Sequence, residues 1–291
     1  MLNLIVAPKV HNDNAETIAK SVVKYLKQEK VEYSVYFSES FASITENVEN
    51  LISFGENEFV IIGDDAVISS VLNSVKDISK LKIGIIPTGK KDDFASYLGL
   101  ETKPIEATKK ILEKSIETVD FLLANNMKVI NNIVIGASAE IFEAYDQFKL
   151  KNPISQIYAE SKYGKTFAGI ELTLDVKGSK NKTEKVFELV VANGGNCKGK
   201  HISPLSNVED GLFNLIYTTT EQTEDKKKTL KLFNTGNHIY EENTKQQWIN
   251  NLKITNPDKK IKALIDGAVY TFESLDISVI EKGLKIYNTK K

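Results

Sequence analysis

The sequence is poor in cysteine, lacks an excess of charge of either sign and has no long apolar run. Its 291 residues include one cysteine, Cys197, which excludes an intramolecular disulfide framework and a cysteine-rich metal site. The net charge of −1 gives the chain no overall field that attracts nucleic acid or an anionic bilayer, so we expect no nucleic-acid partner. No apolar stretch approaches the roughly 18 residues of a membrane-spanning helix.

The first residues also lack the features of a targeting signal. The segment Met1–Pro8 has no basic leader and is typical of a β-strand rather than of a signal peptide. We therefore expect a cytoplasmic protein. With 41% hydrophobic residues, a chain of this length can bury a large core and is expected to form two domains.

The first 125 residues alternate predicted strands with predicted helices. Apolar runs closed by proline or glycine are typical of buried parallel strands, and the amphipathic segments between them are typical of covering helices. This alternation predicts a doubly wound parallel-sheet α/β domain over residues 1–125. The predicted strands are 2–7, 33–37, 59–62, 83–86 and 119–123.

After Asn125 the pattern changes to successive strands with few helices. This predicts a mostly antiparallel, β-rich domain over residues 126–291. Two helices are expected between residues 142 and 167, with a break near Asn152-Pro153. The lysines and aromatic residues of this segment fit contact with a bilayer or a lipid head group. The same mixture is also typical of a solvated helix face with its rings turned inward, and both interpretations stay open.

The stretch from Gly84 to Gly99, Gly-Ile-Ile-Pro-Thr-Gly-Lys-Lys-Asp-Asp-Phe-Ala-Ser-Tyr-Leu-Gly, organises the rest of the chain. It predicts a buried strand that ends in a tight turn at Pro87 and Gly89, followed by a short helix that begins at Asp92 or Asp93. In an open α/β sheet, ligands bind beyond the carboxyl ends of the strands, where helix N-termini present free N–H groups.

This stretch is similar to the P-x-G-T-x-N-D-F-A-R segment of the diacylglycerol kinase and sphingosine kinase superfamily of lipid kinases. It shares Pro87, Gly89, Asp93, Phe94 and Ala95 with that segment. The resemblance covers nearly the whole chain in order and spacing. It implies a nucleotide-binding α/β domain, a β-rich lipid-binding domain, and transfer of a phosphoryl group from ATP with Mg²⁺ to a diacylglycerol-type lipid hydroxyl.

The resemblance also implies that three loops at the edge of the first sheet bind the nucleotide. They follow the strands predicted at 2–7, 59–62 and 83–86. Glycines in such loops let backbone N–H groups approach phosphate oxygens, and the helix after each loop adds its positive dipole. The implied nucleotide-binding residues are Pro8, Lys9, Gly63, Asp64, Ala66, Thr88, Gly89, Lys90 and Asp93.

Several of these loop residues depart from the family pattern. Asp64 and Ala66 replace glycines, Lys90 replaces threonine and Asp92 replaces asparagine. Two like charges about 4 Å apart repel by roughly a few kcal/mol at an effective dielectric near 20, so Asp64 would oppose a polyphosphate unless a metal or a lysine offsets it. Three interpretations stay open: Lys90 and Lys91 rebuild the phosphate site, they pair with Asp64 and plug it, or they point into water.

The second domain holds the remaining candidate positions. Asp210 matches a family aspartate that helps to hold Mg²⁺, and the alternative is a tight Asp-Gly turn that needs no metal. Ala268 stands where catalytic relatives have the glutamate proposed as general base, and it cannot accept a proton. Asp65 and Asp266 are therefore the candidate catalytic residues. Ser138 replaces a further family aspartate.

Three functions follow as hypotheses. The first is a lipid kinase with a rearranged site. The second is a catalytically silent family member that binds a lipid or a partner. The third is a protein that binds a different phosphate-containing ligand such as NAD, because NAD kinases share the Gly-Gly-Asp-Gly loop. Their Asn-Asn-Glu motif is not evident in this sequence. The resemblance leaves open transient contact with a membrane surface, a peripheral location there, and a homodimer.

Overall fold

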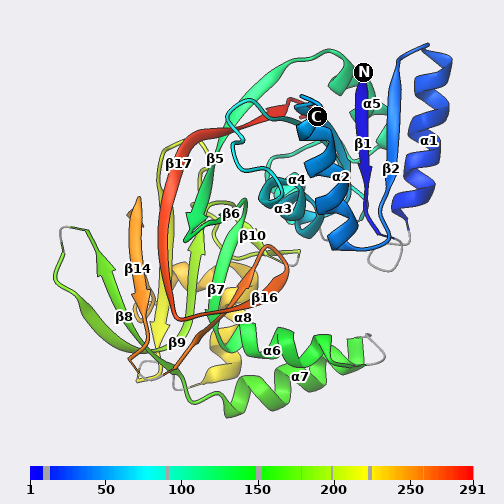
Figure 1. Ribbon diagram of the computed structural model, residues 1–291. Helices are drawn as coiled ribbons and strands as arrows, with labels where there is room; N and C mark the ends of the chain where they lie inside the picture. The colour runs from blue at the N-terminus through cyan, green and yellow to red at the C-terminus, as the bar shows by residue number, and fades with distance from the viewer. Residues whose placement is uncertain are drawn as a thin grey trace. The chain divides into compact units, whose positions relative to one another are not determined.

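The computed structural model describes residues 1–8, 14–89, 92–148, 153–177, 179–197, 199–221, 225–257 and 259–290. The chain forms two compact units (Figure 1). The first unit consists of Met1–Phe121 together with Glu281–Lys291, and the second of Leu122–Ile280. The chain passes from one unit into the other twice, within strand β5 (Ile116–Ala124) and within strand β17 (Ser274–Tyr287).

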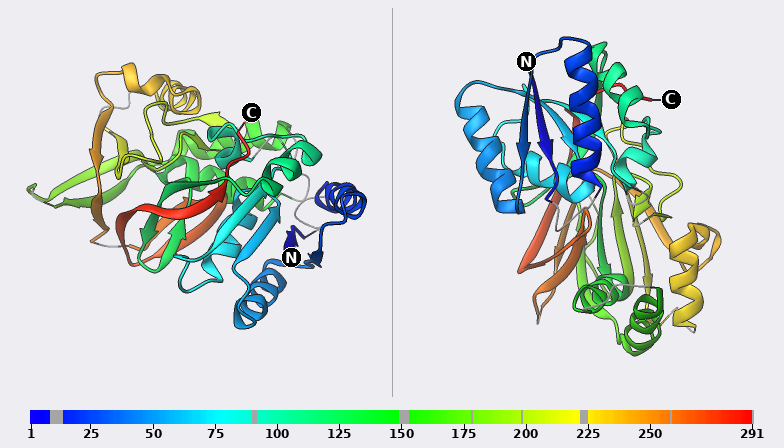
Figure 2. Two further views of the ribbon diagram at one scale, coloured as in Figure 1. Left: turned by 90° about the horizontal axis from the view of Figure 1, so that it is seen from above. Right: turned by 90° about the vertical axis from the view of Figure 1, so that its right-hand side faces the viewer.

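The first unit is built on a parallel sheet in the order β4-β3-β1-β2. Strand β1 lies in its interior with all five residues buried, which explains its unbroken apolar sequence. Helices α1 and α5 pack together on one face, and α2 and α3 pack together on the other (Figure 2). These elements are β1 (Leu2–Val6), α1 (Ala15–Gln28), β2 (Tyr33–Phe37), α2 (Phe41–Ser53), β3 (Glu58–Ile62), α3 (Asp65–Asn73), β4 (Lys82–Ile86), α4 (Asp93–Tyr97) and α5 (Pro104–Leu112).

The end of β17 completes this sheet. Lys285 and Ile286 pair in parallel with Lys82 and Ile83 of β4, so the last strand of the chain lies beside the fourth. Beneath this edge, hydrogen bonds from Lys114, Tyr287 and Lys82 outweigh the effect of burial and lower the pKa of Glu58 to about 2. Because Tyr287 belongs to β17, Glu58 and its three partners hold the C-terminal strand against β3 and β4.

The second unit is antiparallel throughout its described strand pairs. Strand β9 is at its centre and pairs with β7, β8 and β12. The doubly wound first domain and the β-rich second domain are thus confirmed. The strands are β6 (Met127–Val129), β7 (Asn132–Gly136), β8 (Ile170–Val176), β9 (Lys182–Ala192), β10 (Asn196–Cys197), β11 (Lys200–His201), β12 (Phe213–Thr219), β13 (Lys245–Ile249), β14 (Asn251–Thr255), β15 (Ile261–Ile265) and β16 (Ala268–Phe272).

In the described part of the second unit, three helices and one 3₁₀ turn accompany the strands. They are α6 (Ala137–Asp146), α7 (Pro153–Thr166), α8 (Lys226–Thr235) and η1 (Asn237–Tyr240). Helix α7 packs against both α6 and α8, and Figure 1 shows α6 and α7 side by side. Within the described residues, no helix combines the length and the apolar character needed to cross a membrane.

Candidate functional site

The strands that precede the three predicted nucleotide-binding loops are β1, β3 and β4. They are parallel neighbours, so their carboxyl ends meet at one edge of the first unit's sheet. The Ala7 backbone N–H donates to the Ile62 carbonyl over 3.0 Å and joins the first loop to the second. Pro8, at the start of the first loop, is buried.

Asp65 joins the second loop to the third. This residue opens α3, and its side chain is buried. Both of its carboxylate oxygens accept a hydrogen bond from the Phe94 backbone N–H, each over 3.1 Å. A buried carboxylate therefore binds the first turn of α4, and this contact positions the third loop.

Asp64 caps α3 from the position where the family has a glycine. Its Oδ1 accepts a hydrogen bond from the Val67 N–H over 3.3 Å, as an N-cap residue does. Gly63, which precedes it, has a steric reason to be glycine. A Cβ atom there would lie 2.7 to 2.9 Å from the Val67 side chain, so the packing of α3 explains this glycine without a ligand.

Asp92 binds a third backbone N–H group. Its Oδ2 accepts a hydrogen bond from the Gly89 N–H over 2.7 Å. Burial raises the pKa of Asp92 to about 6, against the opposing effect of the Gly89 hydrogen bond, and the nearby charges of Asp64 and Asp93 add to the rise. The loops therefore carry a concentration of negative charge.

The remaining loop positions divide into described and undescribed residues. Thr88 and Asp93 are buried, Ala66 is half-buried on the first turn of α3, and Gly89 is exposed. Lys9, Lys90 and Lys91 lie outside the described residues. The three interpretations of the lysine pair therefore stay predictions.

Several of the described backbone donors at this edge already have partners within the chain. A phosphate at such an edge needs free backbone N–H donors and low negative charge. Here the N–H groups of Val67, Gly89 and Phe94 already bind carboxylates of the chain itself. Among the residues that the structure describes, no group of three or more histidine, cysteine, aspartate or glutamate side chains could hold a metal ion.

In the second unit, Asp266 binds backbone N–H groups. Its buried carboxylate accepts hydrogen bonds from the N–H groups of Ile130, Asn131 and Asn132, over 2.8, 3.0 and 3.3 Å. These contacts fix the start of β7 and are typical of a structural residue. The role of Asp266 as a general base stays a prediction. Ala268 lies at the start of β16.

Asp210 lies in an exposed turn. Its Oδ1 accepts a hydrogen bond from the Leu212 N–H over 3.0 Å, and Gly211 has a φ of 72°. Both features belong to the tight Asp-Gly turn that was the alternative to a metal site. A metal role for Asp210 stays a prediction.

A buried glutamate on β9 was missed at the sequence level. Glu188 lies at the N-terminus of α6, where its Oε2 accepts a hydrogen bond from the Ser138 N–H over 3.0 Å. Burial raises its pKa to about 7, although hydrogen bonds from Ser138 and the charge of Lys200 oppose the rise. Its position in the apolar run 186–192 was the available signal, because a charged residue is seldom fully buried without a specific partner.

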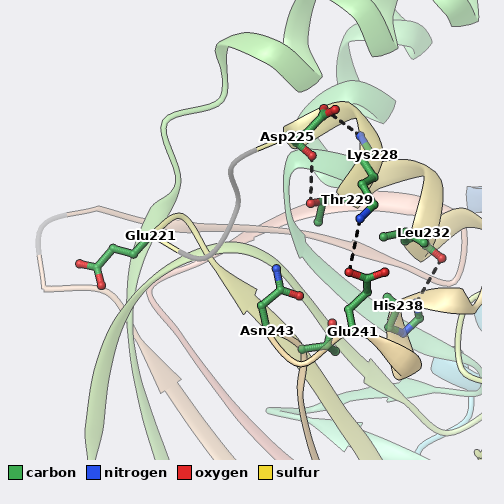
Figure 3. A pocket seen from close by; sticks show the side chains of 9 residues that line it. Glu221, Asp225, Lys228, Thr229, Leu232, His238, Glu241 and Asn243 are labelled. Carbon is green, nitrogen blue, oxygen red and sulfur yellow. Dashed lines mark hydrogen bonds and ion pairs between the residues drawn. The ribbon is translucent and has the colours of Figure 1, made fainter.

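A pocket of about 320 Å³ lies at α8 and η1 (Figure 3). Three of its charged residues, Asp225, Lys228 and Glu241, have partners within the chain. Asp225 accepts hydrogen bonds from the Lys227 and Lys228 N–H groups, and the Lys228 ammonium lies 3.6 Å from Glu241. His238 stacks on Phe233 with ring centroids 4.1 Å apart, and burial lowers its pKa to about 4. These contacts account for Asp225, Lys228, His238 and Glu241 without a ligand.

Comparison with known proteins agrees with the two-unit architecture. Residues 1–124 match the family model "Diacylglycerol kinase catalytic domain", and residues 131–287 match "YegS C-terminal NAD kinase beta sandwich-like domain". YtlR of Bacillus subtilis, provisionally named a lipid kinase, is 22% identical over 261 residues, which cover 80% of this chain and 82% of that protein.

Two solved structures share the fold. A diacylglycerol kinase from Bacillus anthracis superposes with a TM-score of 0.73 at 18% identity, covering 99% of this chain and 96% of its own. An NAD kinase from Archaeoglobus fulgidus, solved in complex with ATP, superposes with a TM-score of 0.54 at 16% identity, covering 100% of this chain and 95% of its own.

Proposed function

This chain belongs to the diacylglycerol kinase and NAD kinase-like superfamily, and from that premise we propose that it is a lipid-binding member whose ATP site is closed by its own aspartates. The β-rich unit supplies the lipid-binding function in this proposal. In this proposal the α/β unit keeps the family fold but does not bind ATP for phosphoryl transfer.

One observation carries the proposal. Two backbone N–H groups at the loop edge, those of Val67 and Gly89, donate to Asp64 and Asp92, which stand where the family has a glycine and an asparagine. A phosphate would have to displace these carboxylates. Each carboxylate would then lose a charge-assisted hydrogen bond, which contributes roughly 1.5–3 kcal/mol.

Charge supports the same conclusion. Asp64 and Asp92 add two carboxylates to Asp65 and Asp93, which match the family, at the edge where the phosphates of ATP would bind. The raised pKa of Asp92 arises partly from Asp64 and Asp93, so these carboxylates already repel one another. A triphosphate would add further repulsion of the same sign, on the order of a few kcal/mol for each close pair.

The residue at the family's general-base position also supports the proposal that this chain is catalytically silent. Ala268 has no group that can take a proton from a lipid hydroxyl, and the neighbouring Asp266 carboxylate is bound by three backbone N–H groups. Loss of a general base typically lowers a rate by about 10²–10⁴-fold. Together with an obstructed phosphate site, this loss would leave little transfer.

A second candidate function is the family chemistry, in which ATP with Mg²⁺ phosphorylates a diacylglycerol-type lipid. Its support is the match of both family models and the retention of Asp65 and Asp93. This function would require Mg²⁺ or a lysine to neutralise the aspartates. Lys9, Lys90 and Lys91 are the loop lysines available in the sequence.

Transfer of labelled phosphate from ATP to diacylglycerol in detergent micelles separates the two candidates. We expect no Mg²⁺-dependent transfer by the natural chain, together with saturable binding of the protein to the same micelles. The variant Asp64→Gly/Asp92→Asn restores two family residues, and it is expected to bind ATP more tightly than the natural chain. The exposed Asp77→Asn is the matched control for loss of an aspartate. Phosphate transfer by the natural chain would support the second candidate instead.

A further inference from the structure

Strand β2 has one open edge. It is the last strand in the order of its sheet, beside β1 (Figure 1). Among the described residues it pairs with β1 alone, in parallel, with Tyr33 opposite Leu2. Its other side therefore presents a row of backbone N–H and C=O groups that no described strand binds. Such a row is a template on which another strand can pair.

The register of β1 and β2 shows which residues supply this row. The Leu2 N–H donates to the Glu32 carbonyl over 2.9 Å, so Glu32 directs its carbonyl toward β1. Successive residues of a strand in a parallel ladder direct their hydrogen-bonding groups to opposite sides. Tyr33, Val35 and Phe37 therefore direct their N–H and C=O groups to the open edge.

The sequence does not protect this edge. Natural sheets guard open edges with charged side chains, proline or bulges. Residues 33–38, Tyr-Ser-Val-Tyr-Phe-Ser, contain neither a charged residue nor a proline. Phe37 is 53% exposed, and Tyr33 and Val35, on the same face of the strand, are partly exposed. This composition fits an edge that another strand covers.

We propose that β2 pairs antiparallel with β2 of a second copy of the chain, about a two-fold axis at Val35. Val35 then lies opposite Val35 of the second copy, and Tyr33 lies opposite Phe37 on each side of the axis. Each of these pairs exchanges two backbone hydrogen bonds, because all of these residues direct their N–H and C=O groups to the edge. The two parallel sheets join through one antiparallel pair, as in many mixed sheets.

Self-complementarity favours a second copy over an unrelated peptide. A two-fold contact requires that the same strand fit itself. On each side of Val35 an aromatic ring lies opposite another, and such cross-strand pairs stabilise a sheet. In this register Glu32 lies opposite Ser38 of the second copy, and Glu39 lies opposite Val31. No acidic residue of the segment therefore opposes another.

The dimer is independent of the proposed function. Pairing through β2 requires neither ATP nor a lipid, and it uses none of the aspartates at the loop edge. The tests below therefore give the same result whether the chain is a silent lipid-binding protein or an active kinase.

Sedimentation velocity over a wide range of protein concentration measures the association. We expect the natural chain to form a dimer. Val35→Lys and Val35→Glu each place two like charges across the axis, so each variant alone should dimerise more weakly by on the order of tenfold or more. An equimolar mixture of the two variants should restore the dimer, because a lysine then lies opposite a glutamate.

The matched control is Thr271→Lys. It adds a lysine at an exposed position of β16, which among the described strands pairs with β15 alone. It should dimerise as the natural chain does, and circular dichroism should give the same spectrum for all variants. The proposal is overturned if the natural chain is monomeric at every concentration, if Val35→Lys dimerises equally well, or if the mixture stays monomeric.

Hydrogen exchange of the natural chain, followed by NMR, tests the register without a substitution. In the dimer the N–H groups of Tyr33, Val35 and Phe37 should exchange as slowly as those of Ser34 and Tyr36, which are directed toward β1. In the dilute monomer those three groups should exchange faster. A dimer in which they remain unprotected would place the contact elsewhere and overturn the proposal.

Discussion

At the scale of single residues, the aspartates of the first unit differ in what they bind. Asp65 is a buried acceptor that joins the second loop to the third, Asp92 is a buried acceptor within the third loop, and Asp64 caps a helix. The sequence identified these residues as site candidates because of their spacing. It could not predict which backbone N–H each carboxylate would bind, because Phe94 is brought to Asp65 only by the pairing of β3 with β4.

Asp65→Ala should destabilise the first unit. The substitution removes both oxygens that accept from the buried Phe94 N–H and leaves that donor without its carboxylate partner. We expect the free energy of unfolding to fall by about 1–3 kcal/mol. Urea unfolding measures this change, and Glu49→Ala, at an exposed acidic residue of α2 in the same unit, should leave the value nearly unchanged. Equal stability of the two variants would contradict the role of Asp65.

Glu188 should make stability depend on pH. Its pKa is about 7 in the folded chain, against an ordinary value of 4.5. The folded state therefore holds the proton more tightly. Glu188 therefore makes its full contribution to the free energy of unfolding below about pH 4.5, and this contribution is lost as the pH rises through about 7.

Glu188→Gln removes this titration while keeping an oxygen that can accept from Ser138. Between about pH 5 and about pH 8, the natural chain should lose on the order of 3 kcal/mol relative to the variant. Urea unfolding across that range measures the difference. The exposed Glu209→Gln should follow the natural chain. If Glu188→Gln leaves the pH dependence of stability unchanged, the raised pKa of Glu188 is contradicted.

At the scale of elements, the apolar runs predicted the strands of the parallel sheet because buried strands need unbroken apolar sequence. They predicted the turns less well, because turns depend on close contacts between distant segments. Gly136 is an example. It has a φ of 122°, and a Cβ atom there would lie 2.3 Å from the Phe187 carbonyl oxygen on β9.

Gly136→Ala should therefore be strongly destabilising. The backbone of β9 cannot yield as a flexible side chain would, and a backbone conformation that essentially only glycine adopts adds strain of about 1–3 kcal/mol. Gly267→Ala is the matched control, because it has a φ of 88° and no atom within 4 Å of the added carbon. Thermal unfolding should give a lower midpoint for Gly136→Ala than for Gly267→Ala. Equal midpoints would mean that the contact with β9 has no effect.

At the scale of the whole molecule, the family resemblance predicted the two kinds of domain correctly. Apolar periodicity could not predict that Glu281–Lys291 belongs to the first unit, because that depends on the pairing of β17 with a strand far away in the sequence. It also could not tell whether departures from the family motifs open or close the phosphate site. That answer depends on the hydrogen-bond partners of Asp64 and Asp92, which only the folded chain defines.

The most direct test of the closed phosphate site is thermal unfolding of the natural chain with and without millimolar ATP and Mg²⁺. A ligand at 100 times its Kd adds about 2.7 kcal/mol to stability. A gain of this size raises the unfolding midpoint by several degrees. We expect no shift, because the backbone donors at the loop edge already bind aspartates. A clear shift that requires Mg²⁺ would contradict the closed site and support an active lipid kinase.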